Sequence, residues 1–415
     1  MFRFVHTADL HLDAPLKSLA LKDPDLFDLV GNATRRALER IVDLCLEEEV
    51  NALMIAGDLY DGDMRSMKTA AFLVGQMERL SAAGVAVFMI RGNHDAESVL
   101  TRELEFPPNV HVFTGHGGTV ELPESGVAVH GVSFAKPQAP ESLLPKYKPP
   151  VSGLFNIGLL HTSLAGASGH DTYAPCSVND LIAHGFDYWA LGHIHIRQVH
   201  AETPHVVMPG MPQGRDIGEA GPKSVTLVTV DKGTASLEDR VTSPVEFARQ
   251  EVTLDGVDDW RDALREIGAA IASAAMSLSD HSVLRLELVG ETPLAWRLRR
   301  DQDLLLEQVA NLARAQGSVW IDKIVHRLSA PSQAAKGEDP RRELAALMSG
   351  LLDDDAFMER AAREVGDIIG DLPAELRNVF GETEAEEADQ VRALLREGAE
   401  DITARVMSGE AEEPS

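Results

Sequence analysis

The stretch FDYWALGHIH, residues 186–195, combines an apolar run with a polar turn. The apolar run predicts a buried strand, and Gly192 allows a sharp turn at its end. Only one residue separates His193 from His195, so both imidazoles leave the turn on the same side. Two histidines placed in this way are suited to bind a metal ion together with carboxylates. The stretch therefore predicts a metal site at the end of a strand, completed by donors from elsewhere in the chain.

Further polar motifs follow apolar runs upstream. They are Asp9-Leu10-His11 after the run 3–7, Gly57-Asp58 after 52–56, Gly92-Asn93-His94-Asp95 after 85–90, and His161-Thr162 after 156–160. In open α/β sheets, ligand sites gather outside the carboxyl ends of the strands. We therefore expect these motifs to converge in space, although they are far apart in the sequence.

Most of these motifs have an ordinary explanation when each is taken alone. An aspartate at a strand end is often a turn former or a helix cap, and a lone histidine is usually a hydrogen-bonded structural residue. The Gly92–Asp95 motif is more specific, because a plain turn does not need His94. Asp58 could bridge two cations about 3.5 to 4 Å apart. The donor types suit Mn, Fe or Zn, and their ordered combination favours the functional interpretation.

The chain is expected to contain three parts. Residues 1–240 alternate apolar runs with helical patterns, which indicates βα units and a sheet covered by helices. Residues 249–330 have the order β-α-β-α-β, which predicts a small α+β domain. Residues 341–408 form an acidic helical C-terminal region after a polar linker at 330–340. The helices expected in these parts are 32–49, 66–83, 258–275, 295–316, 341–352, 354–369 and 384–407.

Composition and charge restrict the classes of function. The net charge of -28 argues against a protein that coats nucleic acid by bulk electrostatics. Acidic residues are most concentrated after residue 330, so we expect any nucleic acid to bind at a local site in the N-terminal part. Two cysteines are too few for a disulfide framework. The N-terminus lacks a signal-peptide pattern and no window is long and apolar enough to span a membrane, so we expect a cytoplasmic protein without a membrane partner.

The ordered motifs resemble those of the calcineurin-like metallophosphoesterase superfamily. Four segments are similar in sequence to those of its DNA-repair exonuclease branch, the SbcD and YhaO-like nucleases. They are HTADLHLD at 6–13, AGDLYD at 56–61, RGNHD at 91–95 and PGMPQGR at 209–215. The resemblance covers residues 1 to about 235. It implies a layered α/β sheet sandwich flanked by helices, followed by a small α+β cap domain and C-terminal helices.

The resemblance also implies a site with two divalent metal ions, usually Mn²⁺ in this branch. On the family pattern one ion would be held by Asp9, His11, Asp58 and His195, and the other by Asp58, Asn93, His161 and His193. His94 would stabilise the transition state or protonate the departing sugar oxygen. Arg91, Arg215 and Lys223 are candidate phosphate contacts, although a structural ion pair explains each of them equally well. His170 could contact a metal ligand without binding the ion itself, or it could be an ordinary loop residue.

The favoured interpretation is a Mn²⁺-dependent DNA exonuclease in DNA repair, with or without single-strand endonuclease activity. A water activated by two metals would hydrolyse the phosphodiester bond. The resemblance implies an SMC-like coiled-coil ATPase as partner, docked by the helices after residue 341, and it allows a homodimer. For these helices a self-packing domain is the alternative. A phosphodiesterase or phosphatase acting on small nucleotides or phosphoproteins is the alternative function, and a non-catalytic adaptor is a third, which the complete ligand set disfavours.

Overall fold

The structure is a computed structural model of the 415-residue chain. It describes residues 1–14, 24–60, 67–97, 105–164, 173–277, 280–331, 343, 347–348, 350–351, 353–371 and 384–407. His170, most of the linker at 330–340, most of the expected helix at 341–352 and residues 408–415 lie outside the described residues. The chain divides into two compact units. The first contains residues 1–249, 275–285 and 318–322, and the second contains the rest.

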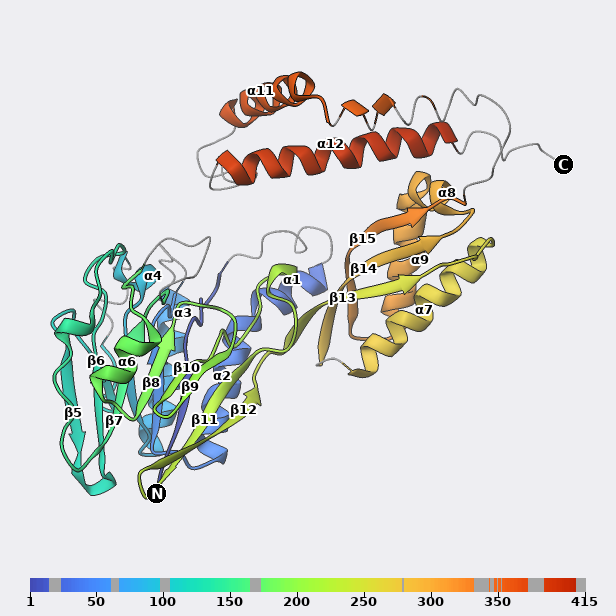
Figure 1. The fold of residues 1–415 in the computed structure, drawn as a ribbon. Helices are drawn as coiled ribbons and strands as arrows, with labels where there is room; N and C mark the ends of the chain where they lie inside the picture. The colour runs from blue at the N-terminus through green and yellow to red at the C-terminus, as the bar shows by residue number, and fades with distance from the viewer. Residues whose placement is uncertain are drawn as a thin grey trace. The chain divides into compact units, whose positions relative to one another are not determined.

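The first unit contains two six-stranded sheets (Figure 1). The first sheet has the order β12 (Thr234–Val241), β11 (Ser224–Asp231), β1 (Phe2–Thr7), β2 (Ala52–Ala56), β3 (Ala86–Ile90) and β4 (Val110–Val112). The second has the order β5 (Gly118–Leu122), β6 (Val127–Gly131), β7 (Phe155–His161), β8 (Tyr188–Gly192), β10 (His205–Met208) and β9 (Gln198–Glu202). This is the layered α/β sandwich that the sequence predicts.

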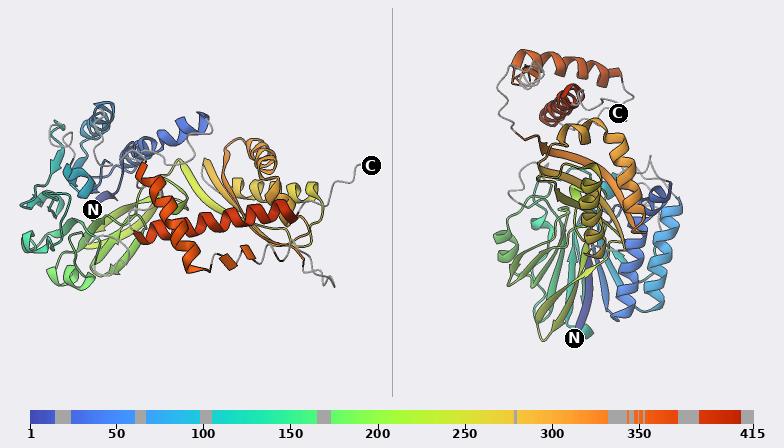
Figure 2. Two further views of the ribbon diagram at one scale, coloured as in Figure 1. Left: turned by 90° about the horizontal axis from the view of Figure 1, so that it is seen from above. Right: turned by 90° about the vertical axis from the view of Figure 1, so that its right-hand side faces the viewer.

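Alternate residues of the central strands belong to different cores. In β1 and β2, Phe4 and Met54 lie in the core between the sheets, whereas Val5 and Leu53 contact the helices outside the first sheet. These helices are α2 (Ala33–Glu47) and α3 (Met67–Ala82), which lie side by side in Figure 2 (right). Strands that are buried on both faces are apolar along their whole length. This explains why unbroken apolar runs mark the strands in the sequence.

The second sheet is also covered on its outer face. Trp189 and Leu191 of β8 pack there with Leu181 of α6 (Val178–His184), while Tyr188 of the same strand faces the core between the sheets. Trp189 Nε1 donates a hydrogen bond to the backbone oxygen of Leu181 at 3.0 Å, which fixes the helix to the strand. The segment before the GHIH turn is therefore held from both sides.

The strands that carry the polar motifs run in common directions. β1 pairs in parallel with β2, and β2 with β3. In the second sheet β7 pairs in parallel with β8, with His161 opposite Gly192. Parallel strands end at the same edge of their sheet, so the loops after β1, β2 and β3 lie together, as do those after β7 and β8.

Three long strands form a separate sheet with the order β13 (Val245–Thr253), β14 (His281–Glu291) and β15 (Val319–Ser329). The helices between them are α7 (Trp260–Ser277), α8 (Ala295–Arg300) and α9 (Gln302–Arg314). The single helix expected at 295–316 is thus two helices, because the chain leaves helical geometry at Asp301 (φ -96°, ψ 34°). In the described part of the chain, none of the helices has the length and apolar character that a membrane span requires.

The C-terminal region contains the helices α11 (Asp355–Asp371) and α12 (Glu384–Met407). Within the second unit, α12 packs against α8. Arg299 of α8 donates hydrogen bonds to Glu400 and Asp401 of α12, and Lys323 of β15 pairs with Glu397 at 2.9 Å. Part of the acidic surface of α12 is therefore neutralised by basic residues of its own chain.

Candidate metal centre

The loops that carry the predicted ligands have an unusual backbone. Asp9, His11, Asp58 and His193 have φ angles of 53°, 40°, 53° and 104°, in or near the left-handed region that non-glycine residues rarely occupy. Such strain persists only where surrounding contacts impose it. Here the loops after β1 and β2 hold each other, since the Asp9 amide donates to Gly57 O at 3.0 Å and the His11 amide to Asp58 O at 3.1 Å.

Two glycines allow the loops to approach each other closely. A Cβ atom at Gly92 would lie 2.1 Å from Asp58 Oδ1, and one at Gly192 would lie 2.1 Å from the backbone oxygen of Ala56. Neither distance is possible for non-bonded atoms. Gly92 and Gly192 are therefore needed for close contact between the loops, in addition to their role in turning the chain.

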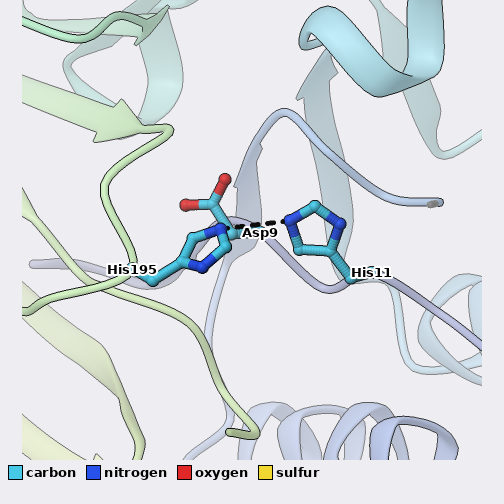
Figure 3. Close-up of side chains that lie close together, drawn as sticks. All are labelled: Asp9, His11 and His195. Atoms are coloured by element: carbon cyan, nitrogen blue, oxygen red, sulfur yellow. Dashed lines mark hydrogen bonds between the residues drawn. The ribbon is translucent and has the colours of Figure 1, made fainter. Parts of the chain in front are cut away.

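The first donor cluster consists of Asp9, His11 and His195, whose ligand atoms all lie within 4.8 Å of one another. Figure 3 shows Asp9 and His11 on one segment, the loop after β1, and His195 on another, the loop after β8. The Nε2 atoms of the two histidines face each other at 3.2 Å. Neighbouring nitrogen ligands of one ion, each about 2.1 Å from it, have a similar separation of about 3 Å.

The second donor cluster consists of Asp58, His161 and His193, again within 4.8 Å. His161 Nε2 lies 3.3 Å from Asp58 Oδ2 and 3.0 Å from Asn93 Oδ1. Asp58 Oδ2 is also 4.0 Å from His11 Nε2 of the first cluster. The structure thus brings the predicted ligands together, and Asp58 lies between the two clusters.

The chemistry of this donor set fits divalent cations. Burial raises the pKa of Asp9. Burial also disfavours the charged form of Asp58, but the neighbouring His161 holds the pKa of that carboxyl below its usual range. For His161 itself, burial would lower the pKa, and Asp58 instead raises it to about 9. Two buried carboxylates beside imidazoles and an amide oxygen are suitable ligands for Mn, Fe or Zn.

His94 lies at the rim of these clusters. Its backbone amide donates to Asp58 Oδ1 at 3.1 Å, and its partly exposed ring lies 5.1 Å from the ring of His11. The short helix α4 (Asn93–Glu97) begins here, so Asn93 and His94 project from its first turn. The His94 ring therefore lies next to the first donor cluster, and its role in catalysis stays a prediction.

Asp95 connects the two loops that carry Asp58 and Asn93. Its buried carboxylate accepts hydrogen bonds from the amides of Leu59 (2.9 Å), Tyr60 (3.1 Å) and Gly92 (3.0 Å). In the sequence, Asp95 is only the last residue of the Gly92–Asp95 motif, and the motif alone predicts no role for it. Its role is to hold the ligand loops in place, and its position at the end of the Gly92–Asp95 motif is the only signal in the sequence that marks it.

The candidate phosphate contacts already have polar partners. The guanidinium of Arg215 donates to Glu219 Oε1 at 2.8 Å, and Lys223 Nζ donates to the backbone oxygen of Ala220 at 3.1 Å. Arg91 lines a cavity of about 350 Å³ beside Phe134, and its amide donates to Ser133 Oγ at 2.9 Å. A role of these residues in binding phosphate stays a prediction.

Sequence reasoning gave no role to His6 or Glu219. His6 is buried, with Nε2 3.0 Å from Leu191 O and Nδ1 3.0 Å from the hydroxyl of Tyr188. Because a carbonyl oxygen only accepts, Nε2 carries the proton and Nδ1 accepts from Tyr188. His6 therefore links the first sheet to the strand that precedes the GHIH turn. Glu219 Oε1 lies 2.7 Å from His195 Nδ1, a contact across 24 positions that no pattern in the sequence marks.

Models of two protein families match the chain. The model of the calcineurin-like phosphoesterase family matches residues 2–197, and that of the metallophosphoesterase YhaO middle domain matches residues 247–329. The chain is 38% identical over 341 residues to the uncharacterized metallophosphoesterase YhaO of Bacillus subtilis, covering 76% of this chain and 79% of that protein.

More distant relatives share only part of the chain. The DNA double-strand break repair protein Mre11 of Sulfurisphaera tokodaii is 25% identical over 205 residues, which are 48% of this chain and 50% of that protein. A solved structure of a dimetal phosphatase from Danio rerio is 12% identical and covers 58% of this chain and 96% of its own, with a TM-score of 0.38. The match to YhaO spans most of both proteins, and on that basis the chain belongs to the calcineurin-like metallophosphoesterases, in their YhaO-like branch.

Proposed function

We propose that the protein is a metal-dependent DNA exonuclease that hydrolyses phosphodiester bonds in DNA repair. The observation that supports it most is the pair of adjacent donor clusters with Asp58 between them and His94 at their rim. The likeness to Mre11 over about half of that repair protein supports DNA as the substrate. We further propose Mn²⁺ as the metal and the cytoplasm as the location.

In this proposal Asp9, His11 and His195 would hold one ion, Asn93, His161 and His193 the other, and Asp58 would contact both. When bound, two divalent ions lower the pKa of a water molecule and neutralise phosphate oxygens. Asp95 keeps the loops of Asp58 and Asn93 at a fixed separation. His94 donates a hydrogen bond or a proton to the departing sugar oxygen. Hydrolysis by this route needs no covalent bond between enzyme and substrate.

The test is incubation of the pure protein and Mn²⁺ with end-labelled duplex DNA and, separately, with cyclic nucleotides and a phosphopeptide. We expect stepwise shortening of the DNA, absent in Asp58→Ala. The matched control is Asp43→Ala, because Asp43 is an exposed residue of α2 that pairs with Arg79. If the protein hydrolyses a cyclic nucleotide or a phosphopeptide but leaves the DNA intact, its substrate is that smaller molecule and not DNA.

We also propose that the C-terminal helices dock an SMC-like coiled-coil ATPase. Leu394 and Ile402 of α12 are exposed, and exposed apolar side chains on an amphipathic helix suit a partner helix. Co-purification with such an ATPase, lost in a chain that lacks residues 341–415, would support docking. Equal recovery with the truncated chain would end the proposal. A homodimer stays a prediction, which light scattering of the pure protein can test.

A further inference from the structure

His195 has different partners on its two ring nitrogens. Nε2 faces the first donor cluster, 3.2 Å from His11 Nε2, whereas Nδ1 lies 2.7 Å from Glu219 Oε1 (Figure 3 shows the ring with Asp9 and His11). A carboxylate oxygen accepts, so Nδ1 must carry the proton in this contact. The lone pair of the ring is then on Nε2, the atom that points toward Asp9 and His11. One hydrogen bond thus selects the tautomer that can bind a metal.

Glu219 is itself held in place by Arg215. The Arg215 amide donates to Glu219 Oε2 at 2.7 Å, and the guanidinium donates to Oε1 at 2.8 Å. Arg215 Nη2 is 3.3 Å from His195 Nδ1, but both of these nitrogens are donors. Oε1 of Glu219 therefore accepts hydrogen bonds from both His195 Nδ1 and the guanidinium of Arg215. The Glu219 side chain is only 15% exposed, so its carboxylate is partly shielded from solvent.

Hydrogen bonds also fix the backbone around Glu219. Glu219 ends the short 3-10 helix η3 (Ile217–Glu219), and its amide donates to Asp216 O at 3.1 Å. The carboxylate of Asp216 accepts from the Gly218 amide at 2.7 Å, which caps the start of that helix.

In the second cluster, His161 has a different kind of partner on the ring nitrogen that faces away from the donors. His161 Nδ1 faces the backbone oxygen of Ala56 at 2.9 Å, which fixes the same tautomer without a charge. A carboxylate partner raises the basicity of a ligating imidazole more than a neutral carbonyl does. His161 and His195 therefore differ in the group that contacts the ring nitrogen facing away from the donors: a backbone carbonyl for His161 and a carboxylate for His195.

We propose that Glu219, held by Arg215, is a positioning residue that fixes the tautomer and orientation of His195 and so sets the metal affinity of the Asp9–His11–His195 cluster. The Asp58–His161–His193 cluster does not depend on it. Removing such a carboxylate lowers metal affinity by about 10- to 100-fold in comparable sites. The inference rests on the metal centre and not on DNA as the substrate, so it stands or falls separately from the proposed nuclease activity.

The test is a calorimetric titration of the metal-free full chain with Mn²⁺ alone, comparing the wild type with Glu219→Gln. We expect one of two binding events to weaken by about 10- to 100-fold and the other to stay unchanged. Electron paramagnetic resonance supplies a second readout. At a Mn²⁺ concentration that fills both clusters of the wild type, the variant should give the signal of isolated Mn²⁺ in place of that of a spin-coupled pair.

The matched control is Glu238→Gln, an exposed glutamate of β12 whose replacement should leave both binding events unchanged. Melting curves in EDTA check that the variants fold. If Glu219→Gln does not fold, Arg215→Met, which leaves Glu219 in place, should weaken the same binding event by a smaller factor. Wild-type affinity for both ions in a folded Glu219→Gln protein, or in Arg215→Met where only that variant folds, would overturn the proposal.

Discussion

At the scale of single residues, His94 differs from the other polar groups of the site because it lies at the rim and not among the donors. We expect His94→Ala to leave metal binding intact and to lower turnover by about 10²-fold or more, a loss typical of an acid-base group. Steady-state hydrolysis and metal content of the same preparation measure both effects. His116→Ala, at an exposed loop position, is the control. Normal turnover in His94→Ala would remove His94 from the mechanism.

Asp58 is the residue whose loss should affect both clusters. It lies 3.3 Å from His161 and 4.0 Å from His11, so its carboxylate serves the two groups of donors together. We expect Asp58→Ala to abolish hydrolysis and to remove both bound ions, measured as metal per chain after dialysis. Loss of a single ion would mean that Asp58 belongs to one cluster only.

His6 predicts a pH dependence of stability. Burial lowers its pKa from 6.5 to about 3, so the folded chain keeps His6 neutral where the unfolded chain takes up a proton. The contribution of this group to stability is complete above about pH 6.5 and is lost as the pH falls toward 3. The loss is at most about 1.4 kcal/mol per pH unit. His6→Gln should therefore flatten the pH dependence of the free energy of unfolding between pH 5 and 6.5.

Urea denaturation in EDTA at several pH values measures this slope. His116→Gln serves as the control, since it removes an exposed histidine and should leave the slope as it is in the wild type. Parallel curves for His6→Gln and the wild type would show that His6 is not kept neutral by burial.

At the scale of elements, the contact between the ends of β2 and β8 depends on the absence of a side chain at Gly192. A Cβ atom there would lie 2.1 Å from the backbone oxygen of Ala56, so one strand end must move. We expect Gly192→Ala to lower the free energy of unfolding by about 1 to 3 kcal/mol and to weaken metal binding. Urea denaturation and metal titration measure these effects.

Gly75→Ala is the opposite case and a matched control. Gly75 lies inside α3, and a Cβ atom there would meet no atom within 4 Å. Alanine favours the helix, so this variant should gain about 0.5 to 1 kcal/mol. If both variants changed stability in the same direction, the close approach at Gly192 would not be the cause.

The elements that the sequence predicts well have an unbroken apolar run or a long amphipathic pattern. β2 and α12 have the expected bounds, because an apolar run or a long amphipathic pattern specifies each of them. β9 was not predicted, since its residues are mostly exposed and show no alternation. The helix α1 (Pro24–Gly31) was also missed, because eight residues are too few for a clear period. The break at Asp301 was not predicted, because the helical spacing of leucines continues on both sides of it.

The candidate site could be predicted only where a residue type is itself informative. Histidines, aspartates and an asparagine after strands indicate ligands, and the structure brings them together. Glu219 is one glutamate among many in an acidic chain, and its contact with His195 arises only from the tertiary fold. Residues that act by positioning a ligand therefore need coordinates to be found.

At the scale of the whole molecule, the donor clusters and the C-terminal helices belong to different compact units. Every predicted ligand lies in the first unit, whereas α11 and α12 lie in the second. The acidic residues that dominate the net charge are most concentrated in that second unit. We therefore expect changes in the packing of α12 to leave the chemistry of the metal centre unaffected.

Arg299 offers a test of this separation. Its side chain is only 10% exposed and binds Glu400 and Asp401 of α12, whose side chains are 45% exposed. Solvent screens such pairs, so Arg299→Ala should cost about 1 kcal/mol, which corresponds to roughly fivefold faster amide exchange in α12. Exchange in β1 and β2 and the metal content should not change. Arg265→Ala, at a residue that is 66% exposed, is the control. Faster exchange in β1 and β2 would show instead that the two units unfold together.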